Sequence, residues 1–189
     1  MAAVRRAGAQ GGACSLVEIV PATSSDRPEI EALLDAVFGP GRHTRTASLL
    51  RAEAEPIAGP SLVVRDKGRL LGSIQFWPIT LAATAVTPLT LLGPVAVASE
   101  ARTLGLGRQL LAASLAIADA SAIDPILLIG DLSYYGPFGF AAGPTAGWSL
   151  PGPVERARLL LRWTGCGELP VTATVRPATA KYARPMSAV

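Results

Sequence analysis

The fold of this chain is decided by residues 91–111, which read Leu-Leu-Gly-Pro-Val-Ala-Val-Ala-Ser-Glu-Ala-Arg-Thr-Leu-Gly-Leu-Gly-Arg-Gln-Leu-Leu. The pattern predicts a buried strand, a turn, and a helix whose first turn begins at Arg102. Gly105 and Gly107 have no side chains, so an anion can approach the backbone N–H groups at the helix start, where the helix dipole also favours negative charge. We therefore predict a phosphate site at this turn, flanked by Arg102 and Arg108.

A glycine and a proline, Gly93-Pro94, interrupt the strand in the first half of this stretch. Proline has no N–H to donate to a sheet, so the strand must bulge or separate from a neighbour at this point. An opened strand that leads into an anion-binding turn predicts a slot for a long, phosphate-bearing ligand.

Two motifs stand in order along the chain, Arg102-Thr-Leu-Gly-Leu-Gly107 and Tyr134-Tyr-Gly-Pro-Phe-Gly-Phe140. They resemble Gln/Arg-x-x-Gly-x-Gly/Ala and Phe-Tyr-x-x-x-Gly-Phe, which follow the fourth and fifth strands in the GCN5-related N-acetyltransferase (GNAT) superfamily. Phe38-Gly-Pro-Gly-Arg42 and Trp77-Pro78 further resemble one bacterial branch of predicted N-acetyltransferases. The resemblance spans about residues 16–163. It implies an α/β (α+β) fold, a mixed central sheet of about seven strands flanked by about four helices and splayed at the fourth and fifth strands.

The resemblance implies an N-acetyltransferase that moves an acetyl or other short acyl group from acetyl-CoA, or another acyl-CoA, to a primary amine by direct attack and without a metal. The turn would hold the pyrophosphate, and the strand beyond Pro94 would pair with the pantetheine arm. The alternative is that the two glycines of the turn only allow tight packing of the helix on the sheet. The implied cofactor-binding residues are Val95, Ala96, Val97, Arg102, Thr103, Leu104, Gly105, Leu106, Gly107 and Arg108.

Tyr135 matches the position at which many family members have a general acid, while we expect Tyr134 to pack in the core. A phenol has a pKa of about 10 and a thiol about 8.5, so protonating the departing thiolate is uphill by about 2 kcal/mol. A hydrogen bond to the sulfur would offset part of this. A backbone N–H beside Pro94 would face the thioester oxygen. Asp131, after a predicted strand, is the candidate general base, but it would serve equally as a helix cap.

The acceptor side of the family corresponds to the loop between the first two predicted helices. Arg42, His43 and Arg45 lie there and are the candidates for contact with the acceptor. An exposed histidine without such a role is the alternative for His43. The sequence leaves open whether the acceptor is a small-molecule amine or an amine of a peptide or protein, and it leaves the oligomeric state open.

Length and composition favour one domain, for which we expect residues 15–176. The chain has 189 residues, 50% of them hydrophobic, and a net charge of +3. That surplus suits a polyanionic cofactor but is too small to indicate nucleic-acid binding. Residues 70–99 carry no charge, but their prolines and glycines favour buried strands over a membrane span. We expect a disordered N-terminal arm (1–14), a loose tail (177–189), and a cytoplasmic location in which Cys14 and Cys166 stay reduced.

Hydrophobic periodicity and turn residues predict the remaining elements. Asp66-Lys-Gly-Arg69 predicts a hairpin, and Asp26 with Glu29 predicts a helix N-cap with its reciprocal partner. Leu104, Leu111 and Leu115 are expected on the buried side of the long helix. The predicted strands cover 15–20, 61–65, 70–77, 89–97, 126–130 and 171–175. The predicted helices cover 26–37, 46–55 and 104–120, and a helical turn is predicted at 133–137. Residues 156–163 are predicted to form either a strand or a helix.

Two other functions compete with acyl transfer. A dinucleotide site needs a third glycine, but Leu110 stands at that position. A domain that binds acyl-CoA without transferring the acyl group, as a sensor or an interaction module, remains the alternative, because no carboxylate lies between Leu70 and Ser99.

Overall fold

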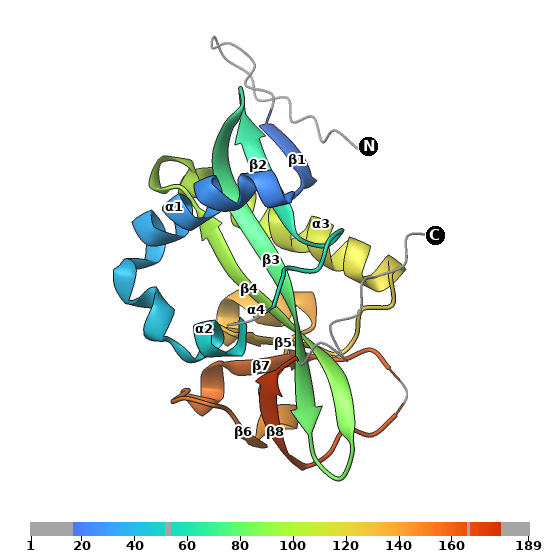
Figure 1. The fold of residues 1–189 in the computed structure, drawn as a ribbon. Helices are drawn as coiled ribbons and strands as arrows, with labels where there is room; N and C mark the ends of the chain where they lie inside the picture. The colour runs from blue at the N-terminus through green and yellow to red at the C-terminus, as the bar shows by residue number, and fades with distance from the viewer. Residues whose placement is uncertain (1–16, 52–53, 166, 179–189) are drawn as a thin grey trace.

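The structure is a computed structural model that describes residues 17–178, apart from 52–53 and 166. The predicted arm (1–14), both cysteines and all but the first two residues of the predicted tail lie outside the described residues. The described residues form an eight-stranded sheet (Figure 1). Its strands are β1 (Val17–Pro21), β2 (Leu62–Asp66), β3 (Arg69–Ala82), β4 (Val86–Val97), β5 (Ile126–Ile129), β6 (Gly147–Ser149), β7 (Leu159–Arg162) and β8 (Thr172–Pro177).

The strands follow the order β1-β2-β3-β4-β5-β7, and β8 pairs with the far half of β3 and with β6. Neighbours in the main path are antiparallel except β4 and β5, which are parallel and are joined through helix α3 (Leu106–Ala120). The predicted fold class, an α/β (α+β) fold with a mixed central sheet flanked by helices, is confirmed.

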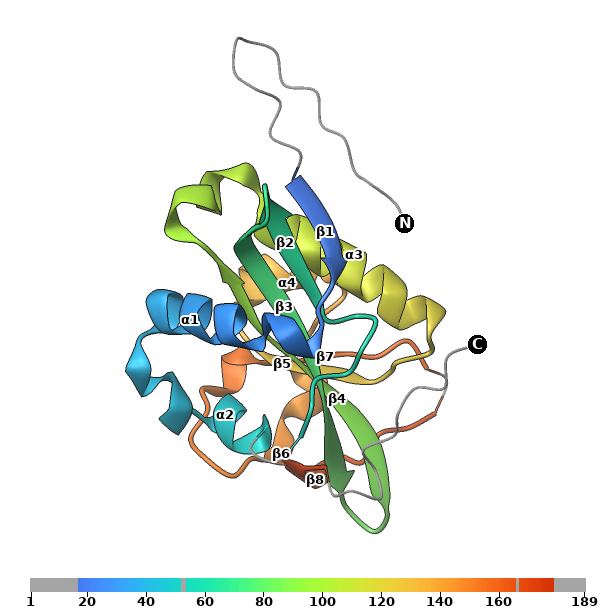
Figure 2. The same ribbon diagram turned by 45° about the horizontal axis from the view of Figure 1, so that its top comes forward.

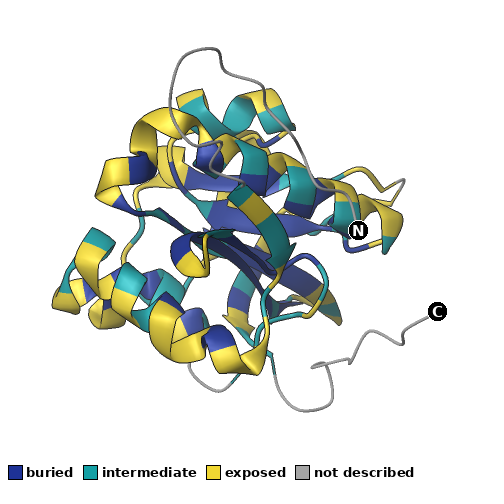
Figure 3. Ribbon diagram, turned by 90° about the horizontal axis from the view of Figure 1, so that it is seen from above, coloured by how far each residue is buried: buried dark blue, intermediate teal, exposed yellow. Residues whose placement is uncertain are grey.

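Helices cover both faces of the sheet (Figure 2). Helices α1 (Arg27–Phe38) and α2 (Thr46–Arg51) lie on one face, and α3 lies on the other. The short helix α4 (Leu132–Tyr135) follows β5. Seen from above, the strands are buried between helices whose outer surfaces are exposed (Figure 3). The predicted helical turn at 133–137 corresponds to α4 and the 3₁₀ segment Gly136–Phe138.

Strand β3 organises the core because its side chains alternate between the two faces. Ile74 and Phe76 pack under α3, while Trp77 packs with Leu50 of α2 on the opposite face. All four are at least nine-tenths buried. The first half of β3 pairs with β2 and its last residues pair with β8, so one long strand connects the whole sheet.

The break at Gly93-Pro94 opens the sheet, as the sequence predicts. Ile74 pairs with Val95 and Phe76 pairs with Leu92, so the glycine and the proline form a bulge in β4. Pairing between β4 and β5 covers only two residue pairs, the last of which is Leu91 with Leu127. Beyond that pair, β4 has β3 on one side and no paired strand on the other among the described residues, so the predicted splay between the fourth and fifth strands is present.

Two helices differ from their predicted ranges. Helix α2 covers Thr46–Arg51, and residues 54 and 55, which were predicted to belong to it, are not helical. The long helix begins at Leu106, because the left-handed Gly105 separates it from a 3₁₀ segment, Ser99–Leu104. Leu104, expected on the buried side, belongs to that segment and is 51% exposed.

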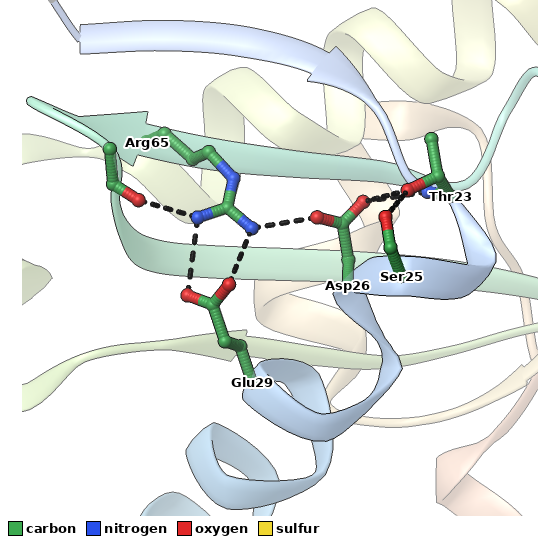
Figure 4. A network of polar contacts seen from close by, with 6 residues as sticks. Thr23, Ser25, Asp26, Glu29 and Arg65 are labelled. Carbon is green, nitrogen blue, oxygen red and sulfur yellow. Dashed lines mark hydrogen bonds and ion pairs between the residues drawn. The ribbon is translucent and has the colours of Figure 1, made fainter.

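Asp26 is the N-cap residue of α1, as predicted, but its side chain makes no capping hydrogen bond, and the carboxylates of Asp26 and Glu29 are engaged elsewhere (Figure 4). Asp26 accepts hydrogen bonds from Thr23, and both Asp26 and Glu29 pair with Arg65 of β2, at 2.6 and 2.9 Å from its Nη2. Burial opposes ionisation of Asp26, but the bonds from Thr23 and Arg65 hold its pKa below the ordinary value. Bonding to Arg65 likewise lowers the pKa of Glu29. The network anchors the start of α1 to the sheet.

Candidate active site

A cleft of about 670 Å³ lies at the opening between β4 and β5. One wall comes from the bulged part of β4, a second from the end of β5 and from α4, and a third from the segment after α1 together with α2. The loop before β7 closes the remaining side, and its Pro153 carbonyl accepts a 2.6 Å bond from the Thr46 hydroxyl of α2. The cleft therefore joins segments that are up to about a hundred residues apart in the chain.

The glycine turn lies at the α3 end of the opening. Gly105 has a φ of 68°, which favours glycine, and a side chain added there would meet no atom within 4 Å. Arg102, Thr103 and Arg108 are exposed around it. The first N–H groups of α3 lack acceptors within the helix. This arrangement provides an open group of donors at the positive end of the helix dipole, which is suited to a phosphate.

Gly107 has a different structural role from Gly105. A Cβ atom at Gly107 would lie 2.8 Å from the hydroxyl oxygen of Tyr134. The ring of Tyr134 also lies under the guanidinium of Arg108, 5.5 Å from its central carbon. Tyr134 is half-buried against the core under α3, but it also lines the cleft, and its hydroxyl extends to the glycine turn.

Tyr135 lines the cleft and lies against the backbone of Gly130, where a Cβ atom would be 2.3 Å from its ring. It makes edge contacts with Tyr134 and Phe140, with ring centres 4.8 and 6.1 Å away. Burial, with smaller contributions from Tyr134 and Asp131, raises the pKa of Tyr135 to about 12. The hydroxyl is therefore fully protonated at neutral pH, and full proton transfer to a thiolate is uphill by about 5 kcal/mol, more than the sequence alone suggests.

Asp131 also lines the cleft, with an exposed side chain at the start of α4. Its carbonyl accepts the N–H groups of Tyr134 and Tyr135, but its carboxylate makes no capping hydrogen bond. Instead the carboxylate pairs with Arg158 at 3.3 Å. Side-chain capping, one of the two alternatives for Asp131, is therefore not observed, and the carboxylate remains at the edge of the cleft.

The three candidates for acceptor contact occupy different positions. Arg42 lines the cleft but is buried, and its guanidinium bonds to Glu31 and Asp35 of α1 at 2.5 and 2.7 Å. Arg45 lines the cleft, with its guanidinium 5.8 Å from the ring centre of Phe38. His43 is exposed, lies 3.7 Å from Asp35 and is not among the lining residues.

Three charged residues of the cleft were not identified from the sequence, namely Arg51, Glu155 and Arg158. Arg51 stands in a predicted helix with no motif around it, and the other two lie in a region without clear periodicity. Their contribution depends on tertiary packing, so a single sequence offered no local signal for them.

The described residues do not gather three or more His, Cys, Asp or Glu side chains into a group that would hold a metal ion. Among those same residues, no helix has the length and apolarity that crossing a bilayer requires.

Comparison with solved structures identifies relatives of this fold. The GNAT family N-acetyltransferase YhbS from Escherichia coli, in complex with CoA, is 22% identical, with a TM-score of 0.70 over 90% of this chain and 94% of that one. A GNAT family acetyltransferase from Brucella melitensis, in complex with acetyl-CoA, is 26% identical, with a TM-score of 0.64 over 87% and 97%. No curated protein matches the sequence. The family model of the acetyltransferase (GNAT) domain matches residues 18–143, two-thirds of the chain, and the chain therefore belongs to the GNAT acetyltransferase family.

Proposed function

We propose that this protein transfers an acetyl or other short acyl group from acyl-CoA to a primary amine by direct attack. The observation that carries the proposal is that Tyr134 contacts both places: it lines the cleft that contains Tyr135, and its hydroxyl lies 2.8 Å from the Cβ position of Gly107 in the phosphate-suited turn. The side of β4 that has no paired strand beyond Leu91 lies in the same wall of the cleft. The relatives from E. coli and B. melitensis were solved with CoA and acetyl-CoA, and the same cofactor is proposed here.

In this proposal the chain's backbone holds the cofactor. The N–H groups at the start of α3 bind the pyrophosphate, and the side of β4 between Val95 and Val97 pairs with the pantetheine arm. The bulge at Gly93-Pro94 frees a backbone N–H to face the thioester oxygen as negative charge develops on it.

Tyr135 is proposed to donate a hydrogen bond to the departing sulfur. Its pKa of about 12 makes it a poor source of a fully transferred proton, but it ensures that the hydroxyl carries its hydrogen at every working pH. Asp131 and Glu155 are the carboxylates that line the cleft among the described residues. Asp131 is the candidate base that receives the amine proton directly or through water.

A matched pair of variants tests the cofactor site. Gly105 and Gly68 both have a positive φ, 68° and 83°, and both have open space where a side chain would project. Gly105→Glu adds a negative charge to the turn, and Gly68→Glu adds the same charge under the same strain on the β2–β3 hairpin. Calorimetric titration with acetyl-CoA should show binding by the wild type and Gly68→Glu and at least 100-fold weaker binding by Gly105→Glu. Equal affinity of the two variants for acetyl-CoA would show that the cofactor does not bind at this turn.

A sensor or interaction module that binds acyl-CoA without transfer is the second candidate. The high pKa of Tyr135 and the pairing of Asp131 with Arg158 favour it. Multiple turnovers of acetyl-CoA with any amine would exclude it, whereas cofactor binding without turnover across a broad panel of amines would support it.

A further inference from the structure

Arg51, the last residue of α2, lines the cleft. Its guanidinium is fixed by a hydrogen bond of Nε and by contact with one aromatic ring. Its Nε donates to the Ala47 carbonyl at 3.0 Å, and its central carbon lies 5.3 Å from the ring centre of Trp77. Trp77 is buried, so the indole provides a fixed support for the guanidinium. The two terminal amino groups make no hydrogen bond to a described residue and remain available as a fork of donors.

Two other arginines of the cleft, Arg42 and Arg158, differ from Arg51 because they are paired. Arg42 is bound by two carboxylates of α1, and Arg158 is bound by Asp131. Within the described part of the chain, Arg51 forms no ion pair. Arg45, which is exposed at the rim of the same cleft, forms none there either.

Burial makes the isolated charge of Arg51 unfavourable. Desolvation, helped by repulsion from Arg42 and opposed by Glu31, lowers the pKa of Arg51 to about 10. The group is nevertheless charged at neutral pH. A partly buried cation without a carboxylate partner is destabilising unless a bound anion compensates it.

The phosphates of the cofactor do not fill this role in the proposed arrangement. Trp77, which supports Arg51, pairs with Leu91 in the middle of β4. The glycine turn follows the C-terminal end of β4, at Val97. Gly93-Pro94 lies between these two points along the strand. The lining residues of the cleft also exclude the turn itself, residues 102–108. Arg51 therefore belongs to the side of the cleft that is left for the acceptor.

We infer that the acceptor carries an anionic oxoacid group, a carboxylate or a phosphate, in addition to its amine, and that Arg51 binds this group. The inference rests on the proposed acyl transfer and specifies its substrate class. A guanidinium with two free amino groups matches two oxygens of such a group in a bidentate pair. The charge of Arg45 at the rim adds attraction for the same anion.

Matched acceptors test the inference, with acetyl-CoA as the donor. One arm compares β-alanine with β-alaninamide, and the other compares 2-aminoethyl phosphate with 2-aminoethanol, so a carboxylate is distinguished from a phosphate. In at least one arm the anionic member should have a kcat/KM at least tenfold higher than its neutral partner. Arg51→Met keeps much of the packing on Trp77 and should reduce that value by about 10- to 100-fold, mainly through KM. The neutral partner should be unaffected.

Two further variants control for folding and charge. Arg51→Lys keeps the charge but loses the fork, so it should recover only part of the preference. Arg27→Met removes an exposed arginine that pairs with Glu55 at 3.4 Å, and it should leave every rate unchanged. Thermal melting of each variant verifies folding. Equal rates for anionic and neutral acceptors in the wild type, or an unchanged preference in Arg51→Met, would overturn the inference.

Failure of the proposed acyl transfer can be distinguished from failure of the inferred anion site. If acetyl-CoA binds but no amine is acetylated, calorimetric titration of the two anionic amines into CoA-saturated protein still decides the inference. Binding that is lost in Arg51→Met supports it, and no binding in the wild type overturns it. If acetyl-CoA itself does not bind, the proposed function fails, and the same titrations into cofactor-free protein decide the anion site.

Discussion

The two ends of the opening between β4 and β5 are built from different parts of the polypeptide. At the glycine turn, the features suited to binding an anion belong to the backbone. They are the left-handed conformation of Gly105, the absence of a side chain at Gly107, and the N–H groups at the start of α3 that have no acceptor within the helix. At the other end, the features belong to side chains from distant segments, such as Arg51 on Trp77 and Arg158 on Asp131. One end therefore depends on local conformation, and the other depends on how helices and loops pack.

This difference predicts how each end responds to substitution. A backbone site tolerates changes of exposed side chains and is sensitive to whatever alters its glycines. A side-chain site loses function when one group is removed or when the segment that carries it moves.

Tyr135→Phe removes the proposed donor to the departing sulfur and should lower kcat about 100-fold, with little change in the affinity for acetyl-CoA. Gly130→Ala should have a similar effect, because a Cβ atom there would lie 2.3 Å from the ring and displace it. Gly143→Ala is the control, since nothing lies within 4 Å of that position. Steady-state kinetics and cofactor titration measure the two effects. An unchanged kcat in Tyr135→Phe would exclude Tyr135 as the hydrogen-bond donor to the departing sulfur.

Arg65→Met should lower the free energy of unfolding by about 2 kcal/mol at pH 7, because it releases the start of α1 and leaves Asp26 without its cation. The pKa values of Asp26 and Glu29 lie below normal in the folded protein. Their stabilisation is complete above the unfolded pKa values of about 4 and is lost as the pH falls through the folded ones. Urea unfolding from pH 7 to pH 3 should therefore show the difference from wild type shrinking below about pH 4.

The same variant bears on the two ends of the opening. Because α1 leads into the wall of the cleft that is proposed to face the acceptor, Arg65→Met should raise the KM for the acceptor and leave acetyl-CoA affinity unchanged. Arg27→Gln, which breaks an exposed pair, should change stability by less than about 0.5 kcal/mol. A loss of cofactor affinity in Arg65→Met would contradict the independence of the two ends.

Gly107→Ala should weaken acetyl-CoA binding about tenfold, since the added methyl group conflicts with the Tyr134 hydroxyl at 2.8 Å and displaces either the ring or the turn. Tyr134→Phe removes that oxygen. The double variant should therefore regain most of the affinity lost by Gly107→Ala, as measured by calorimetry. If the double variant binds as weakly as Gly107→Ala, the glycine is required by the ligand itself and not by the tyrosine.

Thr103→Ala should have the smallest effect, a change in acetyl-CoA affinity of about twofold or less. Its side chain is exposed, and the proposed site uses the backbone around it. Titration of this variant beside Gly105→Glu compares a side-chain change with a conformational one in the same turn. A large loss in Thr103→Ala would show that this end also depends on side chains.

The features predicted correctly from sequence are those whose cause is local. Pro94 has no N–H to donate wherever it is placed in a sheet, and this predicted the bulge and the splay. The helix after the glycine turn was also predicted, but its start was placed too early. A glycine can adopt either a helical or a left-handed conformation, so the residue type alone does not predict the left-handed Gly105.

The features that were missed or mistaken have distant causes. Asp26 and Glu29 have the spacing of a helix cap, but Arg65, 39 positions from Asp26, provides a stronger charge-assisted partner. Arg51 stands in an ordinary amphipathic helix, and only the fold places it over Trp77. The fold class and the strand-turn-helix order around Gly105 were thus readable from the sequence, whereas the wall of the cleft formed by α2 and the segment before it required the tertiary structure.

The unpaired side of β4 beyond Leu91 also bears on the solubility of the protein. A free strand edge invites pairing with another molecule and, through it, aggregation. Here that edge lies inside the opening between β4 and β5, where β5 diverges from β4. Pro94 also removes one backbone donor from the edge. A neighbouring molecule would have to insert a single extended chain to pair with it, since the edge of a folded sheet is too broad to enter. The same recess that admits a narrow ligand thus protects the protein against edge-to-edge association.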